Sequence, residues 1–225
     1  RFFARVRNRM SKQPYLTVVV PTMSHRRMDR LWEMILKNTI RPSLVVVTDN
    51  TGQGWRPTST PADVKLEVSV PKKNVGVNAV WTGGISRAPD GLLSILNDDV
   101  LISEKFFEHT IRAFRILKKV AVICPTTGRT PGYEEKFRYG IMSRREGWAF
   151  TIRTSVAKNL PAMPPDMFVF CGDDWIWECT HRLGWRWAKD YSNVVFHEIG
   201  QSMSRELRSL LRADKRICRL RLLYG

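Results

Sequence analysis

The chain has 225 residues, of which 43% are hydrophobic and 10% aromatic, and its formal net charge is +16. This length and apolar content suffice for one sizeable core, so we expect a single folded domain. No apolar run is long enough to span a bilayer, and the start of the chain lacks the apolar core of a signal peptide. The four cysteines form no CxxC pair and are too few for a disulfide framework, so we expect reduced thiols in a cytoplasmic protein.

The positive charge is concentrated at the two ends of the chain. Residues 1–12 contain five basic side chains and no acidic one, and residues 204–225 contain seven basic and two acidic side chains. The two ends therefore carry ten of the sixteen net positive charges. Basic ends favour a polyanionic partner, either nucleic acid or an anionic membrane surface, although they also fit a role in solubility alone.

The first half of the sequence alternates between apolar strands and amphipathic helices. Strands are predicted at 15–22, 43–50, 64–70 and 91–99, and helices at 26–39, 74–88 and 104–119. This alternation is typical of βαβ units on a largely parallel sheet. Ligands bind beyond the carboxyl ends of such strands. Three polar clusters fall at these ends, so we expect them to line one crevice: Pro21-Thr22, Asp49-Asn50 and Asn97-Asp98-Asp99.

The second half is less regular. A strand is predicted at 120–127, a mobile loop region at 131–148, a strand followed by a helix at 148–160, a turn feeding a helix at 170–188, and a strand ending at His197 within 192–202. Residues 204–225 predict a basic helix. We therefore divide the chain into a basic extension at 1–14, an α/β domain at 15–203 and the C-terminal helix at 204–225.

Two adjacent carboxylates, Asp98 and Asp99, directly follow an apolar run that predicts a buried strand. They repel one another unless a cation lies nearby. Hard cations such as Mg²⁺ and Mn²⁺ bind such oxygen ligands together with substrate phosphates. The alternative is that Asp99 or Ser103 caps the helix that begins near residue 104.

A second acidic pair, Asp173 and Asp174, lies next to Trp175 and Trp177. Desolvation by the tryptophans would raise the pKa of a carboxylate, which suits a general base that takes a proton from a hydroxyl. The alternative is a helix N-cap in a favourable helix dipole. His197 follows an apolar run and is interpreted either as a core or surface histidine or, beside two acidic pairs, as a ligand.

From about Thr17 to Ser202, the chain resembles family 2-type, GT-A-fold glycosyltransferases that use a nucleotide sugar. The motifs that carry the resemblance are, in order, TVVVPTMSHR, LVVVTDNTGQG, NVGVNAVWTGGISRA, LLSILNDDV, GDDWIWECTHRLGWRW and VVFHEIGQS. The resemblance implies a single GT-A-like α/β catalytic domain with a mostly parallel central sheet flanked by helices, followed by the basic C-terminal helix.

The resemblance also implies roles for individual residues. Asp174 would be the catalytic base and Asp173 would orient the acceptor. Asp99 and His197 would hold Mn²⁺ or Mg²⁺ at the diphosphate of a nucleoside-diphosphate sugar, expected to be a UDP-sugar. Thr22 and Asp49 would contact the base or ribose, and Asn97 would lie beside the ribose. Three further residues would lie near the nucleotide: Asn74, Asn78 and Asp98.

The reaction implied by the resemblance is a single displacement with inversion, and the region 131–148 would be a lid over the donor. The sequence departs from the family at three places. Trp81-Thr82 stands where the family often has Arg-Asn, and Thr48 and Asn97 each replace an acid. These departures leave the identity of the nucleotide open.

The acceptor is less well defined by the sequence. Leucines interleave with arginines in 204–225. One interpretation is contact with duplex DNA, from which a hydroxylated base would be flipped out, as in bacteriophages that modify their own DNA; the sequence leans to this interpretation. The other is a helix on an anionic membrane, serving a lipid-linked or polysaccharide acceptor. Two further alternatives are a non-enzymatic nucleic-acid-binding module and a nucleotidyltransferase, and the lack of a Gly-rich, Lys-containing phosphate loop counts against the second.

Overall fold

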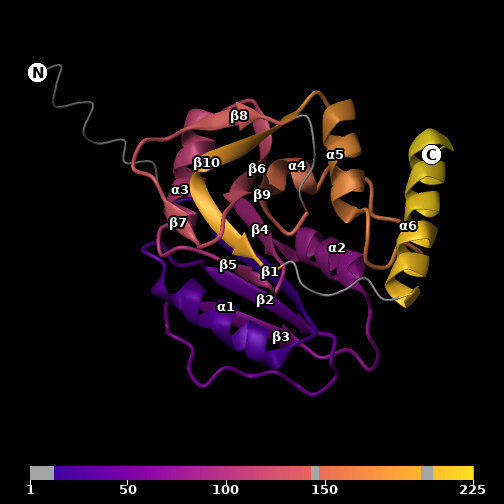
Figure 1. Ribbon diagram of the computed structural model, residues 1–225, viewed down its shortest axis with the longest axis horizontal. Coiled ribbons are helices and arrows are strands. Elements are labelled where there is room, and N and C mark those ends of the chain that lie inside the picture. The colour runs from indigo at the N-terminus through magenta and orange to yellow at the C-terminus, as the bar shows by residue number, and fades with distance from the viewer. Residues whose placement is uncertain (1–12, 143–146, 199–204, 225) are drawn as a thin grey trace, which may run out of the picture.

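The computed structural model describes residues 13–142, 147–198 and 205–224 (Figure 1). At its centre is one mixed β-sheet with the strand order β3-β2-β1-β4-β9-β6-β10-β5, to which β7 and β8 add by pairing with β10. Two apolar cores lie on opposite faces of this sheet. The alternate residues Leu16, Val18 and Val20 of β1 belong to the core formed with α1 and α3, whereas Val19 belongs to the core formed with α2 and α5.

The first half alternates strand and helix as predicted. Its elements are β1 (Leu16–Thr22), α1 (His25–Lys37), β2 (Leu44–Asp49), β3 (Lys65–Ser69), α2 (Val77–Arg87) and β4 (Leu92–Leu96). Strand β1 pairs in parallel with both β2 and β4, and β2 pairs in parallel with β3. The carboxyl ends of β2, β1 and β4 therefore lie side by side at one edge of the sheet.

The second half is mixed in strand direction. Its elements are β5 (Val100–Leu101), α3 (Phe106–Ile116), β6 (Val120–Thr127), β7 (Gly132–Tyr133), β8 (Tyr139–Ile141), β9 (Ala149–Arg153), α4 (Thr154–Ala157), α5 (Gly172–Arg182), β10 (Arg186–His197) and α6 (Arg205–Tyr224). Strand β9 runs antiparallel to both β4 and β6, and β10 is parallel to β6 but antiparallel to β5, β7 and β8. The α/β class is confirmed, and the parallel arrangement holds for the first four strands in the sheet order.

Several boundaries differ from the predictions. Strand β4 ends at Leu96 and helix α5 at Arg182, before the predicted ends at residues 99 and 188. Part of the predicted loop region forms the short strands β7 and β8, which pair with β10. Strand β10 begins at Arg186, six residues before the predicted start, because Trp187 and Ala188 are completely buried against β6. The remainder of the predicted lid includes residues 143–146, which lie outside the described residues.

The C-terminal helix α6 packs beside α5 at the edge of the molecule (Figure 1). Its inward side chains recur at helical spacing and include Asp214, Ile217 and Cys218. Ile217 and Cys218 belong to the same core as α2 and α5. Among the described residues, no helix is both long and apolar enough to cross a membrane. Most of the basic extension, residues 1–12, lies outside the described part of the chain.

Candidate active site

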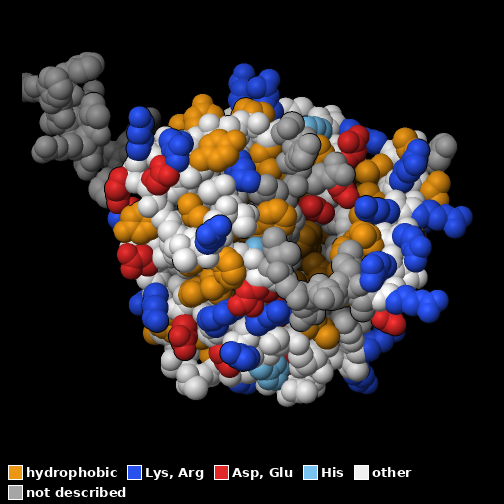
Figure 2. All heavy atoms as spheres, viewed as in Figure 1, with side chains coloured by type: hydrophobic (Ala, Val, Ile, Leu, Met, Phe, Trp, Pro, Cys, Tyr) orange, Lys and Arg blue, Asp and Glu red, His pale blue; other side chains and the backbone are white. Residues whose placement is uncertain are grey.

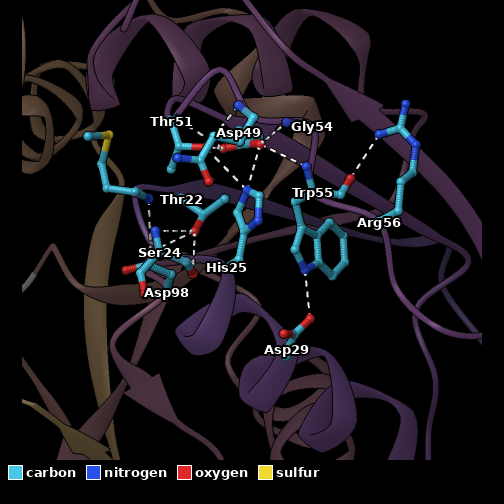
Figure 3. A network of polar contacts seen from close by, with 12 residues as sticks. Thr22, Ser24, His25, Asp29, Asp49, Thr51, Gly54, Trp55, Arg56 and Asp98 are labelled. Atoms are coloured by element: carbon cyan, nitrogen blue, oxygen red, sulfur yellow. Dashed lines mark hydrogen bonds and ion pairs between the residues drawn. The ribbon is translucent and has the colours of Figure 1, made fainter.

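The two adjacent acids after β4 point to different partners. Asp98 is 9% exposed, and its Oδ2 accepts hydrogen bonds from the hydroxyl of Thr22 at 2.7 Å and from the backbone N–H of Met23 at 3.0 Å (Figure 3). Burial raises the pKa of Asp98, and these two hydrogen bonds offset part of that effect. Asp98 and Thr22 thus join the ends of β4 and β1.

Asp99 instead lies beside His197. The two side chains approach to 3.3 Å between Asp99 Oδ1 and His197 Nε2, and both are partly exposed. The backbone supports this pair, because His197 in β10 is the antiparallel partner of Val100 in β5, and Glu198 N–H donates to the carbonyl of Asp99. The ring of His197 also stacks on Trp148, with centroids 5.2 Å apart and planes 8° from parallel. The structure therefore brings together the two residues predicted as metal ligands.

The polar atoms around this pair fit a hard cation. Two buried oxygens, Asn97 Oδ1 and Asp99 Oδ1, accept no hydrogen bond within the described residues. His197 Nε2 lies 3.3 Å from Asp99 Oδ1, but this contact lacks hydrogen-bond geometry. Carboxylate and amide oxygens are the ligands that Mg²⁺ and Mn²⁺ prefer. In the described part of the chain, no group of three or more His, Cys, Asp or Glu side chains is arranged to hold a metal. An ion at Asp99 and His197 would thus complete its shell with ligand oxygens and water.

The second acidic pair begins helix α5. Asp173 and Asp174 lie in its first turn, where the helix dipole favours a carboxylate, and Cys171 occupies the N-cap in the left-handed conformation, with φ 65°. The predicted alternative of an acidic N-cap is therefore wrong here. It is also wrong for Asp99, because helix α3 has Lys105 at its N-cap and no side-chain cap.

Contacts through Gly147 link the two acidic pairs. A Cβ atom added to Gly147 would come within 2.8 Å of Cγ of Asp173. Gly147 precedes Trp148, the residue that stacks on His197. Asp99, His197 and Trp148 are thus neighbours, and Gly147, which adjoins Trp148 in sequence, brings Asp173 close to them.

Asp174, the second acid of the pair, lines a groove. The groove, of about 600 Å³, lies between α5 and α6. Its other lining residues include Trp177 of α5 and Lys215 and Arg219 of α6. A hydroxyl compound in this groove would therefore meet Asp174, Glu178 and Arg182 on the α5 wall and the cations Lys215 and Arg219 on the α6 wall.

Asp49 shapes the loop that follows β2. It is completely buried, and its two oxygens accept from the backbone N–H groups of Thr51, Gly54 and Trp55 and from the hydroxyl of Thr51, while His25 Nε2 lies at 2.9 Å (Figure 3). Burial alone would raise the pKa of Asp49, but these hydrogen bonds outweigh burial and lower it. In this structure Asp49 thus holds the loop, and its contact with a nucleobase stays a prediction.

The two predicted asparagines lie at the start of α2. Asn78 is 1% exposed, and its amide donates to the carbonyls of Met167 and Phe170 at 3.2 and 2.9 Å. Asn74 is exposed, and its side-chain oxygen accepts from the N–H of Gly76 at 2.8 Å. Asn78 therefore positions the loop that leads into the acidic pair of α5, while the contacts of both residues with a nucleotide stay predictions.

Two residues at the site were missed by sequence reasoning. One is Trp148, whose indole N–H is buried without an acceptor among the described residues. The other is Asp214 of α6, which is 1% exposed and accepts from the N–H groups of Phe168, Val169 and Phe170 at 2.8–3.0 Å. The sequence signal for Asp214 was an acid among the basic residues of a predicted helix, at a position that follows the spacing of its apolar residues.

Comparison with known proteins supports the fold. No protein-family model matches the chain, and no curated protein matches it in sequence. Among solved structures, S. aureus TarS 1-349 in complex with UDP matches with a TM-score of 0.62 and 14% identity over 88% of this chain and 64% of that chain. The mannosyltransferase PcManGT from Pyrobaculum calidifontis, in complex with GDP-Man and Mn²⁺, matches with a TM-score of 0.62 and 16% identity over 95% of this chain and 63% of that chain.

A third match is GalNAc-T7 with UDP, GalNAc and Mn²⁺, with a TM-score of 0.59 and 12% identity over 90% of this chain and 48% of that chain. The chain thus spans less than two thirds of the length of each of these three structures. These likenesses show the fold, which is the GT-A-like α/β fold expected from the sequence.

Proposed function

We propose that this protein is a metal-dependent glycosyltransferase that moves a sugar from a nucleoside-diphosphate sugar to a hydroxyl acceptor. The observation that carries the proposal is the run of contacts from Asp99 through His197 to Trp148, whose neighbour Gly147 faces Asp173, on a GT-A-like fold. Solved structures of that fold contain UDP or GDP-Man, and two of the three compared here contain Mn²⁺.

The donor side of the site is formed by Asp99 and His197. When bound by these residues, Mn²⁺ or Mg²⁺ would supply positive charge that stabilises a diphosphate leaving group. The indole N–H of Trp148 is buried without an acceptor among the described residues. It would donate a hydrogen bond to an oxygen of the nucleotide sugar. We expect a UDP-sugar, since two of the three solved structures contain UDP.

The acceptor side is formed by the acidic pair of α5. Asp174 lines the groove between α5 and α6 and would take the proton of the acceptor hydroxyl. The hydroxyl oxygen then bonds to the anomeric carbon as the bond from that carbon to the diphosphate breaks, so the configuration inverts. Asp173, which faces Gly147, would hold the acceptor in line with the donor.

Two acceptor classes follow from the positive charge. The sequence leans to hydroxylated bases in DNA, and the alternative is an acceptor on a lipid surface. Both require cations near the groove, and Lys215 and Arg219 meet that requirement. Charge alone does not separate the two classes, and the exposed leucines of α6 favour the second.

The test separates donor binding from transfer. Thermal-shift measurements with UDP-sugars and GDP-sugars should show a rise of about 5–10 °C near saturation that depends on Mn²⁺. Asp99→Asn should reduce this Mn²⁺-dependent rise. Asp174→Asn should abolish release of the nucleoside diphosphate while the thermal shift is retained, and Asp166→Asn, at an exposed acid nearby, should change neither.

Two outcomes would contradict the proposal. If no nucleotide sugar shifts the melting temperature of the wild type, the chain is better explained as a non-enzymatic module. If Asp174→Asn loses donor binding together with turnover, Asp174 supports the structure and is not the base.

A further inference from the structure

The outward face of α6 is strongly basic. All seven of its Lys and Arg side chains are exposed, whereas Glu206 is the one exposed acid of the helix. Figure 2 shows these basic side chains gathered over α6 along one edge of the molecule. The other acid, Asp214, points inward and is used by the loop at 168–170. The outward charge of the helix is therefore not neutralised within α6.

Leucines are exposed on α6 and at the adjoining end of α5. Leu220 and Leu223 are 47% and 62% exposed, and Leu183 at the end of α5 is 52% exposed. The ends of the two helices are joined, because the guanidinium of Arg182 donates to the carbonyl of Leu222. Leu183 and Leu222 also line one apolar groove, of about 500 Å³. Three large apolar side chains thus project into solvent from adjoining helix ends.

These leucines share their face with arginines. Arg212, Arg216, Arg219, Leu220 and Leu223 follow the spacing of a single helix face, opposite to the buried stripe that contains Asp214 and Cys218. The inward stripe supplies the packing that holds α6 on the domain. The exposed leucines are therefore available for a partner.

We propose that the outward face of α6, together with Leu183, binds the surface of an anionic lipid bilayer. Basic side chains near such a surface are attracted by the anionic headgroups. Leucines that project between them enter the boundary between the headgroups and the acyl chains, as in helices that lie on a membrane. The long stems of the arginines allow their charged ends to stay among the headgroups.

Duplex DNA fits this face less well. Phosphate groups accept hydrogen bonds from arginine and lysine, but Leu220 and Leu223 have no donor to offer them. On DNA these leucines would lie against charged phosphates or water. A lipid surface has a partner for both kinds of side chain.

The position of the face bears on the acceptor. Lys215, Arg219 and Leu223 line both the outer surface of α6 and the groove that contains Asp174. A bilayer on α6 would therefore lie at the mouth of that groove. This position indicates an acceptor that is carried on a lipid surface, an inference that rests on the proposed glycosyltransferase function.

The test is vesicle co-sedimentation of the full chain without nucleotide or metal, so its outcome does not depend on glycosyl transfer. The wild type should bind vesicles of phosphatidylglycerol and phosphatidylcholine and should not bind vesicles of phosphatidylcholine alone. The double variant Leu220→Ser, Leu223→Ser should bind about tenfold or more weakly. The double variant Arg216→Gln, Arg219→Gln should bind about 25-fold more weakly. Each basic residue near an anionic surface contributes about 1 kcal/mol, which is about fivefold in affinity.

The matched control is Ile116→Ser, which removes an exposed apolar side chain, 50% exposed, at the end of α3. It should bind vesicles as the wild type does, and each variant should melt like the wild type, since the altered side chains face solvent. The proposal is overturned if the leucine variant binds the anionic vesicles unchanged, or if the wild type binds duplex DNA but no vesicles. A stable dimer that the leucine variant dissociates would also overturn it, because a second copy would then cover this face.

Discussion

Removal of the Asp214 carboxylate should destabilise the protein more than removal of any exposed acid. Asp214 is 1% exposed, and it accepts three backbone hydrogen bonds, from Phe168 at 3.0 Å and from Val169 and Phe170 at 2.8 Å each. In Asp214→Ala these three N–H groups lose their acceptor. The loop that carries them leads directly into the acidic pair of α5, so the loss affects both the fold and the candidate site.

The size of the effect follows from these contacts. A hydrogen bond to a charged group contributes about 1.5–3 kcal/mol, and the three bonds share one carboxylate, so their losses do not add fully. A buried N–H left without an acceptor costs about 1–3 kcal/mol, so with partial additivity the three together should cost about 3–5 kcal/mol. For a protein of this size, 1 kcal/mol shifts the melting temperature by about 2–4 °C. We therefore expect Asp214→Ala to melt about 6–20 °C below the wild type.

The assay is thermal unfolding, with hydrogen exchange at the amides of 168–170 as a local measurement. Asp63→Ala is the control, because Asp63 is an exposed acid whose ion pair with Arg41, at 3.2 Å, should contribute under about 1 kcal/mol. The reasoning is refuted if Asp214→Ala melts within about 2 °C of the wild type and its loop amides stay protected.

Two further predictions concern Asp98 and Gly147. Because burial raises the folded-state pKa of Asp98 above its unfolded value of about 3.9, the wild type should lose stability relative to Asp98→Asn as pH rises through the folded pKa. Urea unfolding of both proteins from about pH 4 to 8 checks this, and a constant difference would contradict it. Gly147→Ala would place a methyl group within 2.8 Å of Cγ of Asp173. We therefore expect turnover to fall about tenfold or more. The Mn²⁺-dependent rise in melting temperature that the nucleotide sugar causes should change little. Equal turnover in Gly147→Ala and wild type would show that Asp173 does not need its present position.

Local sequence pattern was sufficient for most of the elements. The buried strand β1 and the amphipathic helix α1 are visible as an apolar run and as a 3.6-residue spacing, because each element buries its own apolar face. The parallel order of β2, β1 and β4 followed from the alternation of strands and helices, and that order placed the polar strand ends together.

What the sequence did not reveal depends on distant pairing. The short strands β7 and β8 exist because they pair with β10, and neither has an apolar run of its own. Asp214 likewise has its role only because the 168–170 loop folds back onto α6, far away in sequence. Trp148 was not recognised because its partner His197 reaches it from the far end of the chain. Such contacts have no local periodicity, so single-sequence reasoning has nothing to detect.

The two acids of each adjacent pair point to different partners. Asp98 and Asp99 lie in the turn between β4 and β5, where Asp98 contacts Thr22 and Asp99 contacts His197. Successive side chains diverge by about 100° along a helix. At the start of α5, Asp173 accordingly faces Gly147 while Asp174 lines the groove. Each pair therefore connects two different parts of the molecule, and the two carboxylates of a pair cannot be exchanged without moving one of those contacts.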